Sequence, residues 1–195
     1  MSPLQLLLLP LLLLAAAAAP AAGGAPPVAT PWPEQYRAVI VTNLTESGGR
    51  LRQIEIYYDW PRRRALNFVR DQLSDDPLVD IQWANGSAFL FDYHGSCQVS
   101  HYAVGLLPPD WASRAAYLGR ELVDGFDCHV WASDIDFTRY DEDVATGRPV
   151  SWFAVEGTTR RHVLSFEPGV VVQDDSKYQA PAYCFNGSNA HAPAQ

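Results

Sequence analysis

The chain has 195 residues, with 22 acidic and 14 basic side chains and a formal net charge of −8 at pH 7. An acidic surface of this kind disfavours binding to nucleic acid and to anionic membranes. About 170 residues remain beyond an apolar N-terminal segment, enough for one domain with a core of its own.

Residues 1–24 are typical of a secretory signal peptide. The apolar run Leu6–Leu14 is interrupted by Pro10 and followed by small residues at the cleavage spacing, and it is too short to favour a membrane span. The alternative is an uncleaved anchor. We therefore expect a protein that is secreted or lies in the lumen of the secretory pathway, such as the vacuole, without a transmembrane segment. The remainder divides into a flexible leader at 25–31, one domain at 32–187 and a disordered tail at 188–195.

Short motifs agree with secretion. Glycosylation sequons occur at Asn43, Asn85 and Asn186. The chain has three cysteines, Cys97, Cys128 and Cys184. An oxidising compartment favours one disulfide between two of them, which leaves one thiol over.

The first half of the domain predicts a series of short strands. In Arg52–Asp59, apolar and polar side chains alternate with the period of a half-buried strand. Asn85-Gly86 is the strongest hairpin signal in the chain. The stretch 65–71 could also be a short helix, although its composition favours a strand. Strands are expected at 36–43, 52–59, 65–71, 78–83, 88–93 and 97–104.

One helix is predicted, over Trp111–Leu118. Asp110 suits its N-cap, Trp111, Ala115 and Leu118 recur at helical spacing, and Gly119 follows as a stop. Its single apolar stripe implies packing on a sheet. Further strands are expected at 128–131, 135–141, 150–155, 161–167 and 170–173. About ten short strands in sequential order, with one or two helices, predict a single α+β domain built on a large curved antiparallel sheet.

Several motifs resemble a family of uncharacterised secreted plant proteins, and the resemblance covers residues 32–186. They are Tyr58-Asp59-Trp60-Pro61, Tyr117-Leu118-Gly119, Val123-Asp124-Gly125-Phe126 and the tail Tyr178–Asn186.

Two more distant resemblances suggest a fold and a ligand. Tyr58-Asp59 before Arg62–Arg64, the Asn85-Gly86 hairpin running to Cys97, and Pro181 before Cys184 resemble ependymin-related proteins. The segment from Thr146-Gly147-Arg148-Pro149 to Phe166 is similar to bacterial lipoprotein carriers of the LolA type. Both groups imply an open half-barrel with helices in its mouth and a cavity for lipid. The ependymin resemblance further implies a disulfide between Cys97 and Cys184.

Aromatic and apolar side chains are the candidate ligand-binding residues. A curved sheet has more inner face than one helix can cover, so the rest would line a pocket, although ordinary core packing is the alternative for any one residue. We therefore predict a secreted glycoprotein that binds a hydrophobic or amphipathic, lipid-like ligand. Strand parity selects Ile56, Tyr58, Phe89, Phe91, Trp131, Phe137, Trp152 and Phe166.

Signatures of catalysis are lacking in the sequence. It contains no nucleophile elbow, phosphate loop, dinucleotide fingerprint or histidine pair at metal-ligand spacing, so we expect no cofactor, metal or catalytic residue. One alternative is a glycan-processing enzyme, which needs two carboxylates; Asp134 and Asp136 share a strand face and are its candidates. Another is an adhesion or signalling module without a pocket. The sequence leaves the oligomeric state open.

Overall fold

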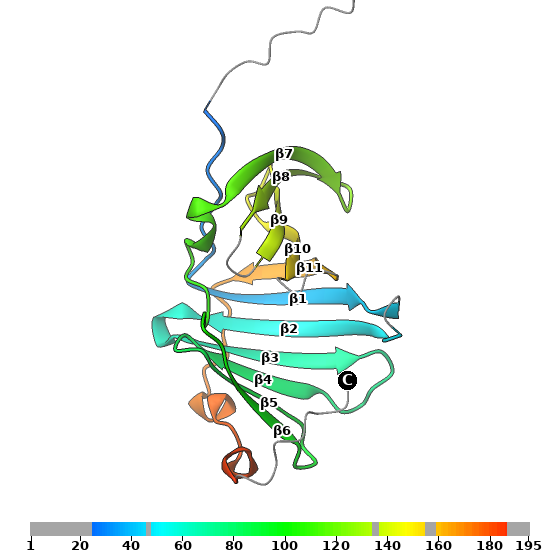
Figure 1. The fold of residues 1–195 in the computed structure, drawn as a ribbon, viewed down its shortest axis with the longest axis vertical. Coiled ribbons are helices and arrows are strands. Elements are labelled where there is room, and N and C mark those ends of the chain that lie inside the picture. The colour runs from blue at the N-terminus through cyan, green and yellow to red at the C-terminus, as the bar shows by residue number, and fades with distance from the viewer. Residues whose placement is uncertain (1–24, 46–47, 134–136, 155–158, 187–195) are drawn as a thin grey trace, which may run out of the picture.

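The computed structural model describes residues 25–45, 48–133, 137–154 and 159–186. The expected signal peptide at 1–24, the tail from 188 and the acidic pair Asp134 and Asp136 lie outside them. Figure 1 shows one curved antiparallel sheet of eleven strands, in the order β6-β5-β4-β3-β2-β1-β11-β10-β9-β8-β7. The strands are β1 (Gln35–Asn43), β2 (Leu51–Asp59), β3 (Arg64–Asp71), β4 (Leu78–Trp83), β5 (Ser87–Phe91), β6 (Cys97–His101), β7 (Ala116–Val123), β8 (Phe126–Ala132), β9 (Phe137–Asp143), β10 (Pro149–Ala154) and β11 (Arg160–Pro168).

The sheet is an open half-barrel, since the edge strands β6 and β7 do not pair with each other. The predicted single domain with a curved antiparallel half-barrel is therefore confirmed, with eleven strands where about ten were expected. Strict sequential order is not observed, because β1 pairs with β2 on one side and with β11 on the other. The sheet thus consists of two meanders joined in the middle.

Alternate side chains of a strand point to opposite faces of the sheet, and this produces the alternating burial that the sequence pattern predicts. In β1, burial alternates along the whole strand, and Tyr36, Ala38 and Ile40 point to the face that we call the inner face. The turn between β4 and β5 contains Gly86 at φ +90°, a left-handed conformation that glycine adopts without strain. Side-chain alternation and turn chemistry together specify the register of these strands.

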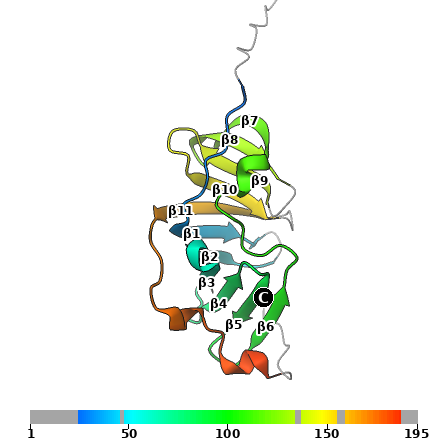
Figure 2. The ribbon, with the colours of Figure 1, turned by 90° about the vertical axis from the view of Figure 1, so that its left-hand side faces the viewer.

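Residues 102–109, which we call the strap, connect the two edges of the sheet. The segment leaves β6 and runs back across the inner face toward η3 (Trp111–Arg114), as Figures 1 and 2 show. The expected strand at 97–104 is therefore shorter and ends at His101. The strap covers part of the mouth that was expected to hold a helix.

A C-terminal segment covers the opposite, outer face. It contains η4 (Asp175–Tyr178) and η5 (Ala182–Phe185), and a disulfide joins Cys184 to Cys97 in β6. Tyr178 is only 1% exposed and belongs to a second core on this face. The disulfide implied by the ependymin resemblance is thus present, and Cys128 is the free, buried thiol.

The predicted helix at Trp111–Leu118 is wrong. Only the short 3-10 helix η3 forms there, Ala115 has extended backbone angles, and β7 begins at Ala116. Trp111 is buried as the helical spacing suggested, but Leu118 is 61% exposed. Pairing of β7 with β8 outweighs the local helical preference, and Gly119, at φ +126°, lies at an irregularity of that pairing rather than at a helix end.

Two further expectations need correction. Residues 170–173 form no strand, because the chain leaves the sheet after β11 to reach the outer face. The leader at 25–31 is partly anchored: Ala29 is buried, and the backbone nitrogen and hydroxyl of Thr30 donate hydrogen bonds of 3.0 and 3.1 Å to Glu142. In the part of the chain described, no helix has the length and apolar character needed to cross a bilayer.

Candidate functional site

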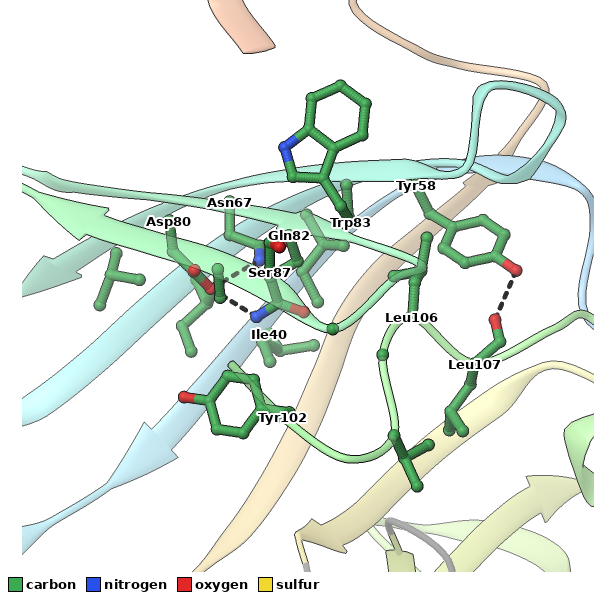
Figure 3. Close-up of a pocket in the computed structure, with 18 of the residues that line it drawn as sticks. Ile40, Tyr58, Asn67, Asp80, Gln82, Trp83, Ser87, Tyr102, Leu106 and Leu107 are labelled. Atoms are coloured by element: carbon green, nitrogen blue, oxygen red, sulfur yellow. Dashed lines mark hydrogen bonds between the residues drawn. The ribbon is translucent and has the colours of Figure 1, made fainter. Parts of the chain in front are cut away.

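A cavity of about 520 Å³ lies between the inner face of β1–β5 and the strap (Figure 3). This volume falls within the range of small-molecule pockets, roughly 300–1,000 Å³. Its walls combine apolar and polar side chains. The residues that line it are Trp32, Tyr36, Ile40, Ile54, Ile56, Tyr58, Ala65, Asn67, Val69, Asp80, Gln82, Trp83, Gly86, Ser87, Ala88, Tyr102, Ala103, Val104, Gly105, Leu106, Leu107, Trp152 and Arg161.

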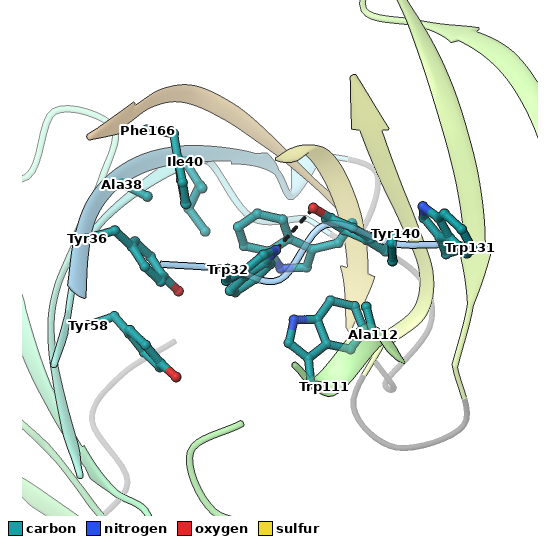
Figure 4. Packing of buried hydrophobic residues seen from close by; sticks show 12 residues of the cluster. Trp32, Tyr36, Ala38, Ile40, Tyr58, Trp111, Ala112, Trp131, Tyr140 and Phe166 are labelled. Carbon is teal, nitrogen blue, oxygen red and sulfur yellow. Dashed lines mark hydrogen bonds between the residues drawn. The ribbon is translucent and has the colours of Figure 1, made fainter. Parts of the chain in front are cut away.

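An aromatic cluster fills the neighbouring part of the half-barrel (Figure 4). Trp32 lies at its centre, where its ring contacts those of Trp111, Trp152 and Phe166 at centroid distances of 5.5, 5.8 and 6.5 Å. Its indole nitrogen donates a 3.0 Å hydrogen bond to the hydroxyl of Tyr140. This cluster forms the end wall of the cavity, so only part of the inner face stays open to a ligand.

The apolar side of the cavity is built by β1, β2 and the strap. Tyr36 and Tyr58 stack with ring centroids 4.8 Å apart, and burial raises the pKa of both phenols. The Tyr58 hydroxyl donates a 2.8 Å hydrogen bond to the Leu107 carbonyl of the strap. Ile56 lies beside Tyr58 on the same face of β2. This side of the cavity therefore presents aromatic and aliphatic surface to a ligand. The Tyr58 hydroxyl donates its hydrogen bond to the strap.

The polar side comes from neighbouring positions of β3 and β4. Asn67 and Asp80 are register partners, and the Asn67 amide nitrogen donates a 2.9 Å hydrogen bond to Asp80 Oδ2. The amide nitrogen of Gln82 donates to the same oxygen at 2.6 Å (Figure 3). Burial raises the pKa of Asp80, while these two hydrogen bonds and the charge of Arg161 oppose the rise.

Replacing Asp80 with asparagine should raise the free energy of unfolding at neutral pH by roughly 1 kcal/mol, because the variant no longer buries a carboxylate. The folded-state pKa lies above the 3.8 of an unfolded aspartate, so the wild-type protein loses stability as the pH rises through that interval. The advantage of the variant should thus grow from acidic to neutral pH. Urea denaturation at about pH 4.5 and 7.5 measures it. An advantage equal at both values would contradict the expectation, and Asp75→Asn in an exposed turn is the control.

Close backbone packing holds the strap against the β4–β5 turn. The Tyr102 nitrogen donates a 2.9 Å hydrogen bond to the Gly86 carbonyl. A side chain at Gly86 would come within 2.1 Å of the Tyr102 carbonyl oxygen, and one at Gly105 within 2.4 Å of the Ala84 oxygen. Only glycine at these positions lets the strap approach the turn so closely.

The residues selected by strand parity divide between three environments. Ile56, Tyr58 and Trp152 line the cavity, whereas Trp131 and Phe166 lie in the aromatic cluster beside it. Phe89 and Phe91 point to the outer face and pack on the second core, because that face is covered as well. The side chain of Phe137 lies outside the described part. The polar residues Asn67, Asp80 and Gln82 were missed, although alternation in β4 already placed Asp80 and Gln82 on one face.

The chemistry available in the cavity is limited. Asp80 is the only carboxylate among its described lining residues, and no group of three or more metal-capable side chains occurs in the ranges that the structure describes. Burial raises the pKa of the Cys128 thiol to about 11, so it stays protonated at neutral pH. The described lining of the cavity therefore offers mainly apolar contact surface, with one carboxylate at Asp80.

Comparison with known proteins gives one family match. A family profile described as a domain of unknown function (DUF8395) matches residues 31–184. No curated protein matches in sequence.

Solved structures resemble the fold at low sequence identity. An uncharacterized conserved protein from Thermus thermophilus has 10% identity and a TM-score of 0.52, over 76% of this chain and 86% of its own. A DUF1329 family protein from Desulfovibrio piger has 9% identity and a TM-score of 0.39, over 75% and 90%. MucB in complex with MucA(peri) has 19% identity and a TM-score of 0.30, over 77% of this chain and 55% of MucB. At 10% identity, the likeness to the Thermus thermophilus protein concerns the fold alone. The plant-protein and ependymin resemblances stay predictions.

Proposed function

We propose that this chain, which belongs to the DUF8395 family, binds a hydrophobic or amphipathic small molecule in the cavity beneath the strap. The observation that carries the proposal is the cavity itself: the inner face of β1–β5 is not filled by the protein's own side chains. In this proposal Ile56, Tyr58 and Trp152 contact the ligand directly. Trp131 and Phe166 act indirectly, by supporting the aromatic end wall.

The size of the cavity restricts the ligand. If each non-hydrogen atom takes roughly the 30 Å³ that a water molecule occupies in the liquid, 520 Å³ holds about 17 such atoms. This favours a molecule with a single hydrocarbon chain or a compact ring system over a phospholipid with two long chains. The proposed lipid-like ligand therefore has one hydrocarbon chain and is smaller than a bilayer lipid.

The two alternative functions receive less support. A glycan-processing enzyme needs two facing carboxylates, and Asp80 has no such partner among the described cavity residues. A pocketless adhesion module would expose a large apolar patch instead of enclosing a cavity. Leu118, Leu122 and Phe126 are exposed on the β7–β8 hairpin, but nothing in the described structure indicates what would cover them.

Secretion and glycosylation form part of the proposal. The Cys97–Cys184 disulfide is typical of proteins from oxidising compartments. Asn43, Asn85 and Asn186 lie in sequons, and all three are exposed, as attachment of a glycan requires. Treating the protein secreted by eukaryotic cells with an N-glycosidase should lower its mass by the mass of one to three glycans. An unchanged mass would contradict glycosylation.

The main experiment uses the same preparation, purified without detergent and extracted with organic solvent. Mass spectrometry of the extract should find an apolar species of about the size given above, in a molar ratio close to one. A denatured sample of the same protein, taken through the same steps, controls for lipid adsorbed from the medium. The proposal fails if the folded protein yields no such species and also takes up none from a panel of single-chain lipids.

A further inference from the structure

Two hydrogen-bond acceptors on the polar side of the cavity have no donor among the described residues. The bond from Asn67 Nδ2 to Asp80 Oδ2 sets the orientation of the Asn67 amide and directs its Oδ1 away from Asp80. That Oδ1 is buried, and no described residue donates to it, in a side chain whose residue is 7% exposed. Asp80 is half-buried, and its Oδ1 receives no hydrogen bond from the described residues, since Asn67 and Gln82 both donate to Oδ2.

An unpaired acceptor of this kind calls for an explanation. More than nine-tenths of buried polar groups in folded proteins have a hydrogen-bond partner, so each exception needs a physical cause, such as a functional role of the group. Asn67 and Asp80 both line the cavity. A donor placed in the cavity would therefore satisfy acceptors on two adjacent strands.

The charges that line the cavity limit what this donor can be. Asp80 and Arg161 are the two charged side chains among the described lining residues, and they carry opposite signs. A cationic head group would be attracted by Asp80 but repelled by Arg161, and an anionic head group would experience the reverse. A neutral group that can donate a hydrogen bond is compatible with both.

We infer that the ligand carries an uncharged hydroxyl head, which donates a hydrogen bond to Asn67 or Asp80 while its hydrocarbon part contacts Ile54, Ile56 and Tyr58. This inference rests on the proposed function and specifies the ligand class of the same site. The hydroxyl of such a ligand would face the polar pair on β3 and β4, and its hydrocarbon part would face the three apolar side chains on β2. An alcohol of about 17 non-hydrogen atoms fits both the size and the polarity.

The test compares four probes with one hydrocarbon chain: hexadecanol, its methyl ether, hexadecylammonium and hexadecanoate. Binding to the delipidated, folded protein is followed by the change in tryptophan fluorescence, since Trp32, Trp83 and Trp152 line the cavity. Hexadecanol should bind about tenfold more tightly than the ether, which cannot donate, and more tightly than either ion. Equal binding of alcohol and ether, or tightest binding of an ion, would overturn the inference and leave the proposed function standing. Failure of all four to bind would overturn both.

Variants of the two acceptor residues show which of them binds the hydroxyl of the alcohol. If the hydroxyl donates to Asn67, Asn67→Ala should bring the affinities for the alcohol and the ether to within about twofold of each other, and if it donates to Asp80, Asp80→Ala should do so. The ether makes no hydrogen bond to either residue, so its binding should persist in both variants. The ether thus reports that the cavity is intact in each variant. Gln98→Ala, at an exposed position of β6 outside the cavity, should keep the full tenfold preference. A tenfold preference that persists in both Asn67→Ala and Asp80→Ala, which lack the two acceptors, would show that the head group lies elsewhere. The comparison of the four probes on the wild-type protein does not depend on either variant folding.

Discussion

Replacing Ala88 with phenylalanine is expected to weaken binding of a single-chain ligand by at least about a hundredfold, with the fold retained. Ala88 lies on the inner face of β5, is 5% exposed and lines the cavity beside Gln82, its register partner on β4. A phenylalanine ring there would occupy space that the ligand needs. Because the ring enters an existing cavity, the overpacking cost of a filled core is avoided and stability is expected to hold or increase.

Titration calorimetry with hexadecanol, or with the ligand recovered from the protein, measures this effect, and thermal unfolding checks the fold. Ala65→Phe is an independent test from β3, because Ala65 is also buried and lines the cavity. Ala116→Phe, at an exposed position of β7, is the matched control and should bind as the wild type does. Unchanged affinity in both cavity variants would exclude the cavity as the binding site.

Removing the disulfide should cost about 4 kcal/mol of unfolding free energy. The bond joins residues separated by 87 positions, and the entropy of closing a loop of that length in the unfolded chain corresponds to roughly 4–5 kcal/mol. The bond also holds the C-terminal segment over the outer-face core, which includes Leu66, Ile81 and Tyr178. The Cys97→Ser, Cys184→Ser double variant should accordingly lose the cross-link and also the packing of the C-terminal segment on the outer-face core.

Urea denaturation of the double variant measures the loss. Cys128→Ala is the control, since it removes a buried thiol without a cross-link and should cost only about 1 kcal/mol. The cavity lies on the opposite face of the sheet, so the folded fraction of the double variant should bind ligand with wild-type affinity. A cost below that of Cys128→Ala would show that the cross-link contributes little.

The strands other than β7 could be predicted, because most of them carry a local signal of alternation or a flanking turn. In β1 and β2 the alternation of side chains reports burial of one face, and the Asn85-Gly86 turn specifies the neighbouring hairpin. The helix could not be rejected, because Trp111 and Ala115 do pack on the core at helical spacing. What decides against a helix is pairing of β7 with β8, a tertiary interaction that a local pattern does not contain.

The candidate site was predicted only in part, because strand parity assumes that one face of the sheet is buried. Phe89 and Phe91 pack beneath the C-terminal segment, so the outer face is apolar too, and parity alone cannot tell the two faces apart. The strap is equally hard to foresee, since residues 102–109 carry no periodic signal. The polar pair of Asn67 and Asp80 could have been found, because it depends only on the register between β3 and β4.

The pairing of β1 with β11 has a consequence for how the chain folds as it is made. Val39 pairs with Ser165, so the N-terminal strand keeps one unpaired edge until nearly the whole domain has been synthesised. Strands β2–β6 pair only with their neighbours in sequence, so the β1–β6 meander can form before β11 is made and supplies most of the residues that line the cavity. Trp152 and Arg161 complete that wall only when β10 and β11 arrive. The half-finished sheet thus exposes apolar inner surface and a free edge together, the combination that promotes aggregation during folding and that chaperones counteract.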